Sequence, residues 1–477
     1  MNIDISSKEK YDILLINPPF SILENPDYLT KGTFLDYKME CINPGILSIA
    51  SYVASKGFLV KIIDLSLDKD FEQLISFFKY GTAKIIGVSS TCAYDYLESL
   101  HCIELAYENS PESLLMMGGQ HAGPLGKIVF DDSKYLDLLC LYEGEDLAVN
   151  LINTINSGSC AFEDLKGIIY RQRDTGRIVE NREAPYLIPL DEMPVPNFEL
   201  YPNYLRFTPY VEESRGCPFK CSYCVNSFYD RPARTKSNEI FLRDLDHVIS
   251  LYGKDRLYAF LAANFGMRGD KTCELLEQLK DRGVCWGTEI RVDNPWEKYV
   301  DKLYDAGMRT IGIGMESASP ELLLRMNKTN NPRKYLTKAI NFIKECYQFN
   351  LKPSLNIMAY VGETPKTLKE TLYFLLSLDE YIYRVDAFSV FEIQGTELSV
   401  ELDNLKEETG CERVVTPYTQ KTHIYPLSVS KYYSYEAMSN YCRFIKDLFS
   451  NDEIVDLEEK RWDYREFDFL LKRCQDN

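Results

Sequence analysis

The sequence lacks any long hydrophobic run. No stretch reaches the roughly 18 consecutive apolar residues that a membrane-spanning helix needs. The first residues, MNIDISSKEKYD, also lack the apolar segment of a secretory signal peptide. These absences exclude a transmembrane span and indicate a cytoplasmic location.

Positive charge is also in short supply. The chain has 54 Lys and Arg against 72 Asp and Glu, a formal net charge of −18. Such a field repels phosphates, so nucleic acid and anionic membranes are disfavoured as partners. Hydrophobic residues at 45% and charged residues at 26% are typical of a globular protein, and we expect 477 residues to form two or three domains.

The first part of the chain alternates short apolar runs with helical patterns. "DILLINPP" and "AKIIGVSS" are two of the runs. This alternation predicts a Rossmann-like, doubly wound parallel sheet over residues 1–157, with a ligand site at the carboxyl ends of its strands. Residues 158–205 follow as a hairpin around Asp174-Thr175-Gly176 and a proline-rich linker.

A second alternating series begins near residue 209. Six strand–helix units within residues 206–400 predict a partial (β/α)6 barrel of the TIM type, whose chemistry lies at the carboxyl ends of the strands. One helix has a clear start, with Thr364 as N-cap and Pro365 at the first position. Residues 401–477 are charged and helix-prone, and we expect a mostly helical C-terminal cap on this α/β protein.

Three of the fourteen cysteines are closely spaced, and the other eleven are scattered as expected of buried thiols. Cys217, Cys221 and Cys224 form a C-x3-C-x2-C pattern in "RGCPFKCSYC", directly after the first strand of the second series. Zinc would need a fourth ligand, and the nearest downstream candidate, His247, lies in a predicted helix. Three thiolates at this spacing indicate instead a [4Fe–4S] cluster with one iron left open.

This stretch resembles the signature of radical S-adenosylmethionine (SAM) enzymes. The resemblance implies that the open iron binds the amino and carboxylate groups of SAM. Reductive cleavage of SAM would then yield a 5′-deoxyadenosyl radical that abstracts hydrogen from a substrate. The aromatic position before the last cysteine, here Tyr223, would lie beside the SAM adenine.

Looser matches suggest three more SAM contacts. "GIGMES" (312–317) resembles the fourth-strand segment whose acid approaches the ribose, which suggests Glu316. Asn264 stands in the second-strand motif that contacts the SAM amino group, although Ala262 and Ala263 depart from the usual acidic or polar residues. Arg291 either holds the SAM carboxylate, holds the substrate or packs at the barrel rim.

The N-terminal part resembles the cobalamin-binding domains that precede some radical SAM barrels. The matching segments include "INPP" (16–19), "MMGGQHAG" (116–123) and "LYEGEDLAVNLI" (141–152), and the likeness covers about residues 11–390. The residues implied at the cobalamin site are Asn17, Pro18, Gly118, Gly119, His121 and Gly144. The D-x-H-x-x-G motif that ligates cobalt in many cobalamin proteins is absent, but several members of the fused family lack a protein ligand there.

The resemblance implies an enzyme with a [4Fe–4S] cluster, SAM and cobalamin as cofactors. The main hypothesis is a C-methyltransferase that methylates an unactivated carbon of a small-molecule or peptide substrate. The alternative is a non-methylating reaction, such as ring contraction, cyclisation, deoxygenation or decarboxylation, with or without cobalamin. A remote alternative is a non-catalytic cluster or corrin sensor. Either enzyme needs an external electron donor such as flavodoxin or ferredoxin.

Overall fold

The computed structural model describes residues 8–20, 41–66, 68, 70–158, 162–229 and 232–449. Two compact units make up the chain. Unit 1 consists of residues 1–208 and 420–423, and unit 2 consists of residues 209–419 and 424–477. The domain boundaries expected at residues 157, 205 and 400 stay predictions.

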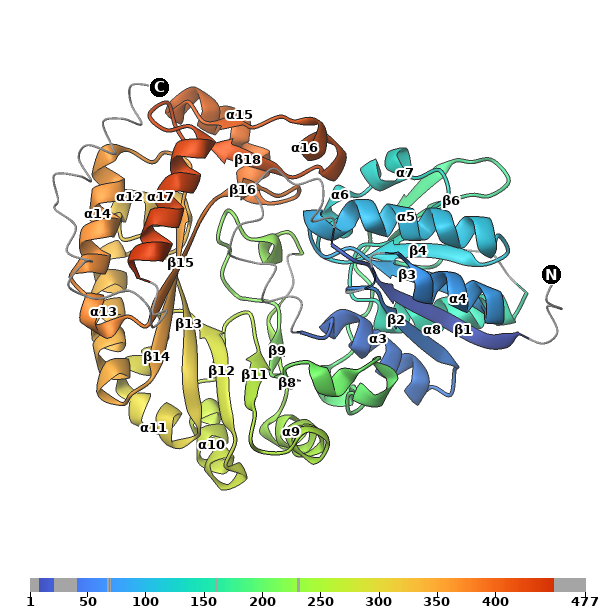
Figure 1. Ribbon diagram of the computed structural model, residues 1–477, viewed down its shortest axis with the longest axis horizontal. Coiled ribbons are helices and arrows are strands. Elements are labelled where there is room, and N and C mark those ends of the chain that lie inside the picture. Colours follow the sequence, from blue (N-terminus) through green and yellow to red (C-terminus); the bar gives the residue numbers. More distant parts are fainter. Residues whose placement is uncertain are drawn as a thin grey trace. The chain divides into compact units, whose positions relative to one another are not determined.

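Unit 1 is built on a seven-stranded sheet of order β2-β1-β3-β4-β5-β6-β7 (Figure 1). The first five strands are parallel. They are β1 (Glu9–Asn17), β2 (Val60–Asp64), β3 (Gly81–Ser89), β4 (Leu114–Gly118) and β5 (Leu138–Cys140). Apolar runs such as Ile13–Ile16 are fully enclosed because helices cover the sheet.

Helices connect the parallel strands of unit 1. They are α3 (Pro44–Ser55), α4 (Glu72–Tyr80), α5 (Ala93–Asn109), α6 (Ala122–Leu125), α7 (Ile128–Asp132) and α8 (Glu145–Asn156). The strand order reverses between β1 and β3, which is where a doubly wound sheet opens a crevice at its carboxyl edge. The hairpin β6 (Ile168–Arg171) and β7 (Ile178–Asn181) extends the sheet antiparallel beyond β5.

Unit 2 contains six parallel strands in the order β15-β14-β13-β12-β11-β8. They are β8 (Tyr210–Glu212), β11 (Leu257–Leu261), β12 (Cys285–Ile290), β13 (Met308–Glu316), β14 (Lys352–Ala359) and β15 (Arg384–Ser389). Helices follow the strands and lie on the outside of the sheet (Figure 1). They are α9 (Asn238–Tyr252), α10 (Asp270–Leu279), α11 (Val300–Asp305), α12 (Pro320–Arg325), α13 (Pro332–Gln348) and α14 (Pro365–Leu376). The predicted partial barrel is therefore confirmed.

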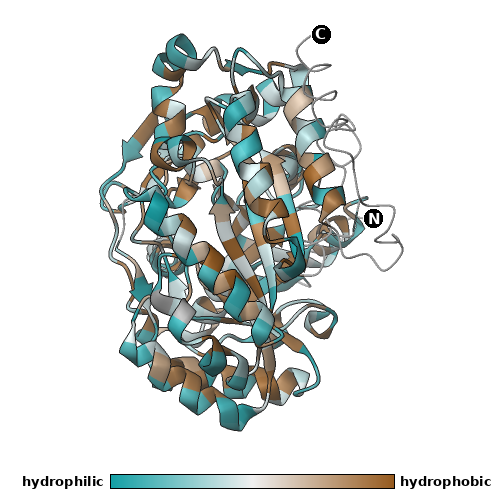
Figure 2. Cartoon of the chain, turned by 90° about the vertical axis from the view of Figure 1, so that its left-hand side faces the viewer, coloured by the Kyte–Doolittle hydropathy of each residue, from teal (hydrophilic) through white to brown (hydrophobic). Residues whose placement is uncertain are grey.

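Hydrophobic and hydrophilic residues alternate along the helices and strands (Figure 2). Phe241 of α9 packs edge-to-face on Phe260 of β11, and Phe260 stacks on Trp286 of β12. The α14 start is capped as expected, since the Thr364 hydroxyl accepts a hydrogen bond from the Thr367 N–H.

The C-terminal region is more than a helical cap. Its helices are α15 (Glu397–Thr409), α16 (Pro417–Thr422) and α17 (Tyr435–Leu448), and α17 packs on β15. A small antiparallel sheet accompanies them, formed by β16 (Phe391–Glu392), β17 (Glu412–Arg413) and β18 (Tyr425–Ser428). The expected cap over residues 450–477 lies outside the described residues.

Candidate functional site

The three closely spaced cysteines lie on one loop at the carboxyl edge of the barrel. A short hairpin closes this loop, formed by β9 (Ser214–Arg215) and β10 (Arg234–Thr235). Cys221 is buried, and Cys217 and Cys224 are half-buried. Burial raises the pKa of the Cys217 and Cys224 thiols, and the charge of the neighbouring Cys221 raises both further.

The rest of unit 2 holds this loop from two sides. The Ser222 N–H donates to the Met326 carbonyl beyond α12, at 3.0 Å. The Ser222 hydroxyl lies 2.8 Å from the Tyr360 hydroxyl after β14, and the Ser222 carbonyl accepts from the Leu398 N–H of α15. Anchors on three elements preorganise the loop before any cofactor binds.

Arg291 touches the cysteine loop directly. Its Nη1 lies 3.3 Å from Cys221 Sγ, and its guanidinium lies 3.7 Å from the centroid of the Phe219 ring. A two-point ion pair with Asp293, at 2.7 and 3.0 Å, fixes the side chain from the opposite end. This cation can stabilise the negative charge of a thiolate-ligated cluster.

Lys328 lies among the residues that are predicted to contact SAM. Its Nζ lies 2.9 Å from Glu316 Oε1 and 3.4 Å from the Tyr223 hydroxyl, and its carbonyl accepts from Arg291 Nη2 at 2.5 Å. Lys328 and Glu316 are both buried. Glu316 adopts a left-handed φ of 65° at a break in the β13–β14 register, a conformation that costs energy and is typical of functional sites. Sequence reasoning missed Lys328.

Asn264 connects to the same group through Arg291. Its Oδ1 accepts hydrogen bonds from the Arg291 backbone N–H at 3.0 Å and from Asn294 at 3.1 Å. Its Nδ2 is buried and finds no acceptor among the described residues. The structure thus brings together Tyr223, Asn264, Arg291 and Glu316 around the cysteine loop, and their roles toward SAM stay predictions.

The donor set fits an iron–sulfur cluster. Cys217, Cys221 and Cys224 are free thiols of one loop, and the cations Arg291 and Lys328 lie beside it. Within the described ranges, no three His, Cys, Asp or Glu side chains are placed to hold a single metal ion. Of the scattered cysteines, five are buried as expected (Cys102, Cys140, Cys346, Cys411 and Cys442), whereas Cys285 is exposed. Cys160 and Cys474 lie outside the described residues.

In unit 1, a polar network lines the carboxyl edge where β1 and β2 end. Asn17 Nδ2 donates to Asp64 at 2.8 Å. Asn43 Nδ2 donates to Asn17 at 2.9 Å and to Ser89 at 3.2 Å. Pro18 follows directly and is buried. This edge therefore presents hydrogen-bonding groups at the switch point of the sheet, as the resemblance expects of a cofactor crevice.

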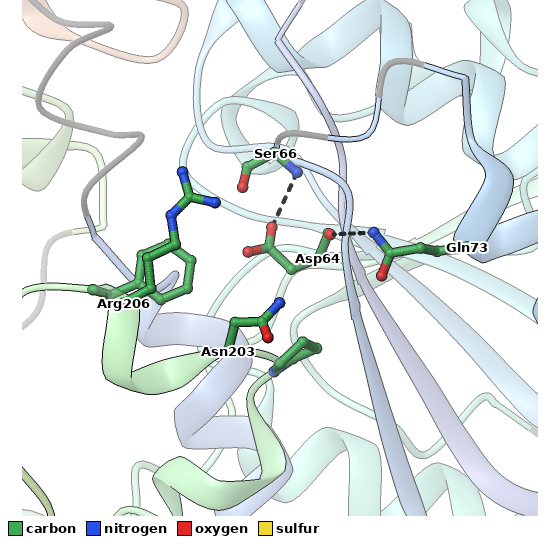
Figure 3. A pocket seen from close by; sticks show the side chains of 7 residues that line it. Asp64, Ser66, Gln73, Asn203 and Arg206 are labelled. Atoms are coloured by element: carbon green, nitrogen blue, oxygen red, sulfur yellow. Dashed lines mark hydrogen bonds between the residues drawn. The ribbon is translucent and has the colours of Figure 1, made fainter.

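A small cavity of about 60 Å³ adjoins this network (Figure 3). Asp64, Gln73, Asn203 and Arg206 line it, and the Ser66 N–H donates to Asp64 Oδ1 at 3.1 Å. The cavity is large enough for about two water molecules. It extends the polar edge but is too small for a cofactor ring.

The predicted glycines differ in their surroundings. A Cβ on Gly119 would lie 2.2 Å from the Ser90 carbonyl oxygen, and one on Gly118 would lie 3.3 Å from Cys140 Cβ. Because neither glycine has a Cβ, Ser90 and Cys140 can pack closely against the backbone at the end of β4. Gly144 precedes α8, and a Cβ there would meet Ile49 of α3 at 2.7 Å. Gly144 therefore serves the packing of two helices.

His121 is buried within unit 1. Its Nε2 lies 2.8 Å from the Thr422 carbonyl oxygen, and its ring packs edge-to-face on Tyr96. A cobalt bond from this nitrogen would require the loss of that hydrogen bond. The role of His121, like that of the other cobalamin residues, stays a prediction.

The sequence of this chain is similar to those of several known proteins. The radical SAM superfamily matches residues 211–375. An uncharacterized methyltransferase of Pyrococcus horikoshii is 26% identical over 70% of this chain and 73% of its own length. The anaerobic magnesium-protoporphyrin IX monomethyl ester cyclase of Cereibacter sphaeroides is 26% identical over 56% of this chain, but over only 45% of its own length.

A solved structure extends the likeness to both units. The cobalamin-dependent SAM radical enzyme OxsB, with aqua-cobalamin and SAM bound, superposes with a TM-score of 0.71 over 98% of this chain and 71% of that chain, at 18% identity. No helix in the described part of the chain is long and apolar enough to cross a membrane. The predicted α/β fold class is confirmed. The match of residues 211–375 to the radical SAM superfamily and the methyltransferase among the relatives support the predicted family and an enzyme, and a [4Fe–4S] cluster and SAM are the cofactors that the superfamily implies. Residues 211–375 of this chain are therefore similar to the radical SAM superfamily, and the fold of the chain is similar to that of the cobalamin-dependent SAM radical enzyme OxsB.

Proposed function

We propose that this protein methylates an unactivated carbon atom of its substrate, using a cluster and SAM in unit 2 and cobalamin in unit 1. The observation that carries the proposal is the convergence of the cysteine loop with Arg291, Lys328, Glu316 and Tyr223 at one edge of the barrel. When bound there, the cluster and SAM supply a 5′-deoxyadenosyl radical that abstracts hydrogen from carbon.

Different residues of the chain bind the cluster and SAM. Cys217, Cys221 and Cys224 anchor the cluster, and the Arg291 guanidinium donates to the Cys221 sulfur. The ion pair with Lys328 holds the buried Glu316 carboxylate at a position where a ribose diol can donate hydrogen bonds to it. A buried carboxylate needs such hydrogen-bonding partners. Tyr223 presents its ring beside the last cysteine for the adenine.

Cobalamin in unit 1 would rest on the polar edge formed by Asn17 and Pro18 and beside the end of β4 at Gly118 and Gly119, where the chain packs closely against Ser90 and Cys140. The cobalamin bound in OxsB supports this part of the proposal, and the methyltransferase among the relatives supports the methyl transfer. His121 keeps its hydrogen bond with the Thr422 carbonyl and is not needed as a cobalt ligand, in agreement with the absence of a D-x-H-x-x-G motif.

The second candidate is a non-methylating reaction on the same site. The cyclase of Cereibacter sphaeroides favours it, because that relative is as identical to this chain, at 26%, as the methyltransferase is. In both cases we propose that the protein works in the cytoplasm, takes electrons from a flavodoxin or ferredoxin and acts on a small molecule or peptide.

Product analysis separates the candidates. The protein is reconstituted anaerobically with iron and sulfide, loaded with cobalamin, and given reductant, SAM and a cell extract as the source of substrate. Methylation predicts S-adenosylhomocysteine and 5′-deoxyadenosine in equal amounts, because one SAM donates the methyl group and another the radical. Deoxyadenosine alone indicates the second candidate, and its absence would refute both. Cys221→Ala is the matched negative control.

A further inference from the structure

The strands of the barrel in unit 2 present two different faces. Side chains that point toward the helices are buried, for example Phe260, Thr288 and Ile311, which lie side by side on β11, β12 and β13. The alternate side chains point to the inner face, and most of them are partly or fully exposed there. The inner face, called the lumen below, is therefore less buried than the face toward the helices, although Glu316 and Met358 are buried there too.

Glu289 occupies the middle of this lumen because the neighbouring strand carries glycine. Glu289 pairs with Gly312 of β13, and a Cβ added to Gly312 would lie 2.1 Å from Glu289 Oε1. The three atoms nearest to that Cβ all belong to the Glu289 carboxylate. The carboxylate thus lies across Gly312 and reaches Asn356 Nδ2 of β14 at 3.4 Å.

The other acidic side chains near Glu289 in the lumen already form ion pairs. Asp386, next to Asn356 in the register, pairs with Arg384 at 2.8 Å, and Glu316 pairs with Lys328. In the part of the chain that the structure describes, Glu289 makes no ion pair. Loss of solvation among the surrounding strands and the charges of Glu316 and Asp386 raise the pKa of Glu289, while Arg384 and the hydrogen bond from Asn356 act in the opposite direction. The Glu289 side chain is nevertheless exposed to solvent, and an accessible carboxylate that makes no ion pair favours a cationic ligand.

We propose that Glu289 and Asn356, beside Asp386, form a lumen subsite that binds a cationic nitrogen group of the substrate, an ammonium or a guanidinium. This inference rests on the proposed function, because it assigns the far end of that enzyme's substrate. Gly314, beside the Lys328–Glu316 pair, is two residues beyond Gly312 on β13, about 6.6 Å along the strand. A substrate anchored at Glu289 therefore directs its remaining carbon atoms toward the cysteine-loop edge.

The test uses probes that differ only in charge. The full-length protein, reconstituted with its cluster and loaded with SAM, is titrated calorimetrically with n-butylammonium, n-butylguanidinium, n-butanol and butyrate. A charge-assisted contact predicts that the two cations bind about tenfold more tightly than n-butanol. Glu289→Gln should remove this preference, whereas Glu274→Gln, at an exposed position on α10, should retain it.

Gly312→Ala is a second variant that leaves every charge in place. Its methyl group would displace the Glu289 carboxylate, so the cation preference should fall as in Glu289→Gln. A wild-type protein without charge preference, or a preference that survives both variants, overturns the subsite. Deoxyadenosine formation by the same preparations is measured separately, so a loss of radical chemistry with intact cation preference counts against the proposed function alone.

Discussion

At the residue scale, Arg291 is the side chain with the most direct influence on the cluster site. It is buried, its guanidinium contacts the Cys221 sulfur, and Asp293 and the Lys328 carbonyl keep it from rotating away. Reduction adds negative charge to a thiolate-ligated cluster. A fixed cation in contact with one ligand therefore stabilises the reduced form more than the oxidised form.

Arg291→Met should lower the reduction potential of the reconstituted cluster. Loss of one charge-assisted contact corresponds to about a tenfold change in the equilibrium, or about 60 mV for one electron. An anaerobic potentiometric titration followed by electron paramagnetic resonance measures the potential. Arg333→Met, at an exposed position on α13, is the matched control and should leave it unchanged. An equal potential in wild type and Arg291→Met would show that the guanidinium does not act on the cluster.

Sequence reasoning could identify the residues whose role follows from their spacing along the chain or from a local motif. Cys217, Cys221 and Cys224 lie within eight positions, and Glu316 ends a recognisable strand segment. Lys328 and Glu289 carry no such signal. Lys328 comes after a short helix in a polar loop, and only the folded chain brings it to Glu316. Glu289 depends on Gly312, whose missing side chain leaves room for its carboxylate.

At the scale of elements, the parallel sheets were predictable because buried strands and amphipathic helices have different periods. The start of α14 was predictable from Thr364 and Pro365, since capping is a local interaction. The register break in β13 and the sheet of β16, β17 and β18 were not. Strands of two to four residues have no periodicity to detect, and a bulge depends on the neighbouring strand.

The turn between β14 and α14 contains a buried acid that makes stability depend on pH. Glu363 accepts a short hydrogen bond from the Thr367 hydroxyl, and burial raises the pKa of its carboxyl to about 8. The folded state thus holds a proton that the unfolded chain releases above its ordinary pKa of 4.5. The resulting stability is complete below pH 4.5 and is lost as the pH rises to about 8, at up to about 1.4 kcal/mol per pH unit.

Glu363→Gln removes this proton linkage while keeping an acceptor for Thr367. The melting temperature of the variant relative to wild type should therefore rise between pH 5.5 and pH 8, to an extent worth about 1–3 kcal/mol. Thermal unfolding followed by circular dichroism at several pH values measures the difference. Glu274→Gln, at an exposed position on α10, should show no such trend. A constant difference across this range would mean that Glu363 ionises at its ordinary pKa in the folded protein.

At the scale of the whole molecule, the two candidate cofactor sites are built from separate sets of residues. The cysteine loop and the residues around Arg291 all belong to unit 2, whereas the polar edge at Asn17 and the glycines after β4 belong to unit 1. Each unit has its own sheet and its own buried core, which is the condition for binding one cofactor without the other.

Cobalamin content and iron content should accordingly respond to different substitutions. Replacing Cys217, Cys221 and Cys224 with alanine should abolish cluster iron but leave cobalamin bound, as read from the visible spectrum of protein produced with hydroxocobalamin. Gly119→Val should do the reverse, because its side chain would lie 2.2 Å from the Ser90 carbonyl and the left-handed φ of 114° disfavours any Cβ. Gly45→Ala, in α3 with only an ordinary contact, should retain both cofactors. If the cysteine variant lost cobalamin together with iron while remaining folded, the two sites could not be independent, and the assignment of cobalamin to unit 1 alone would fail.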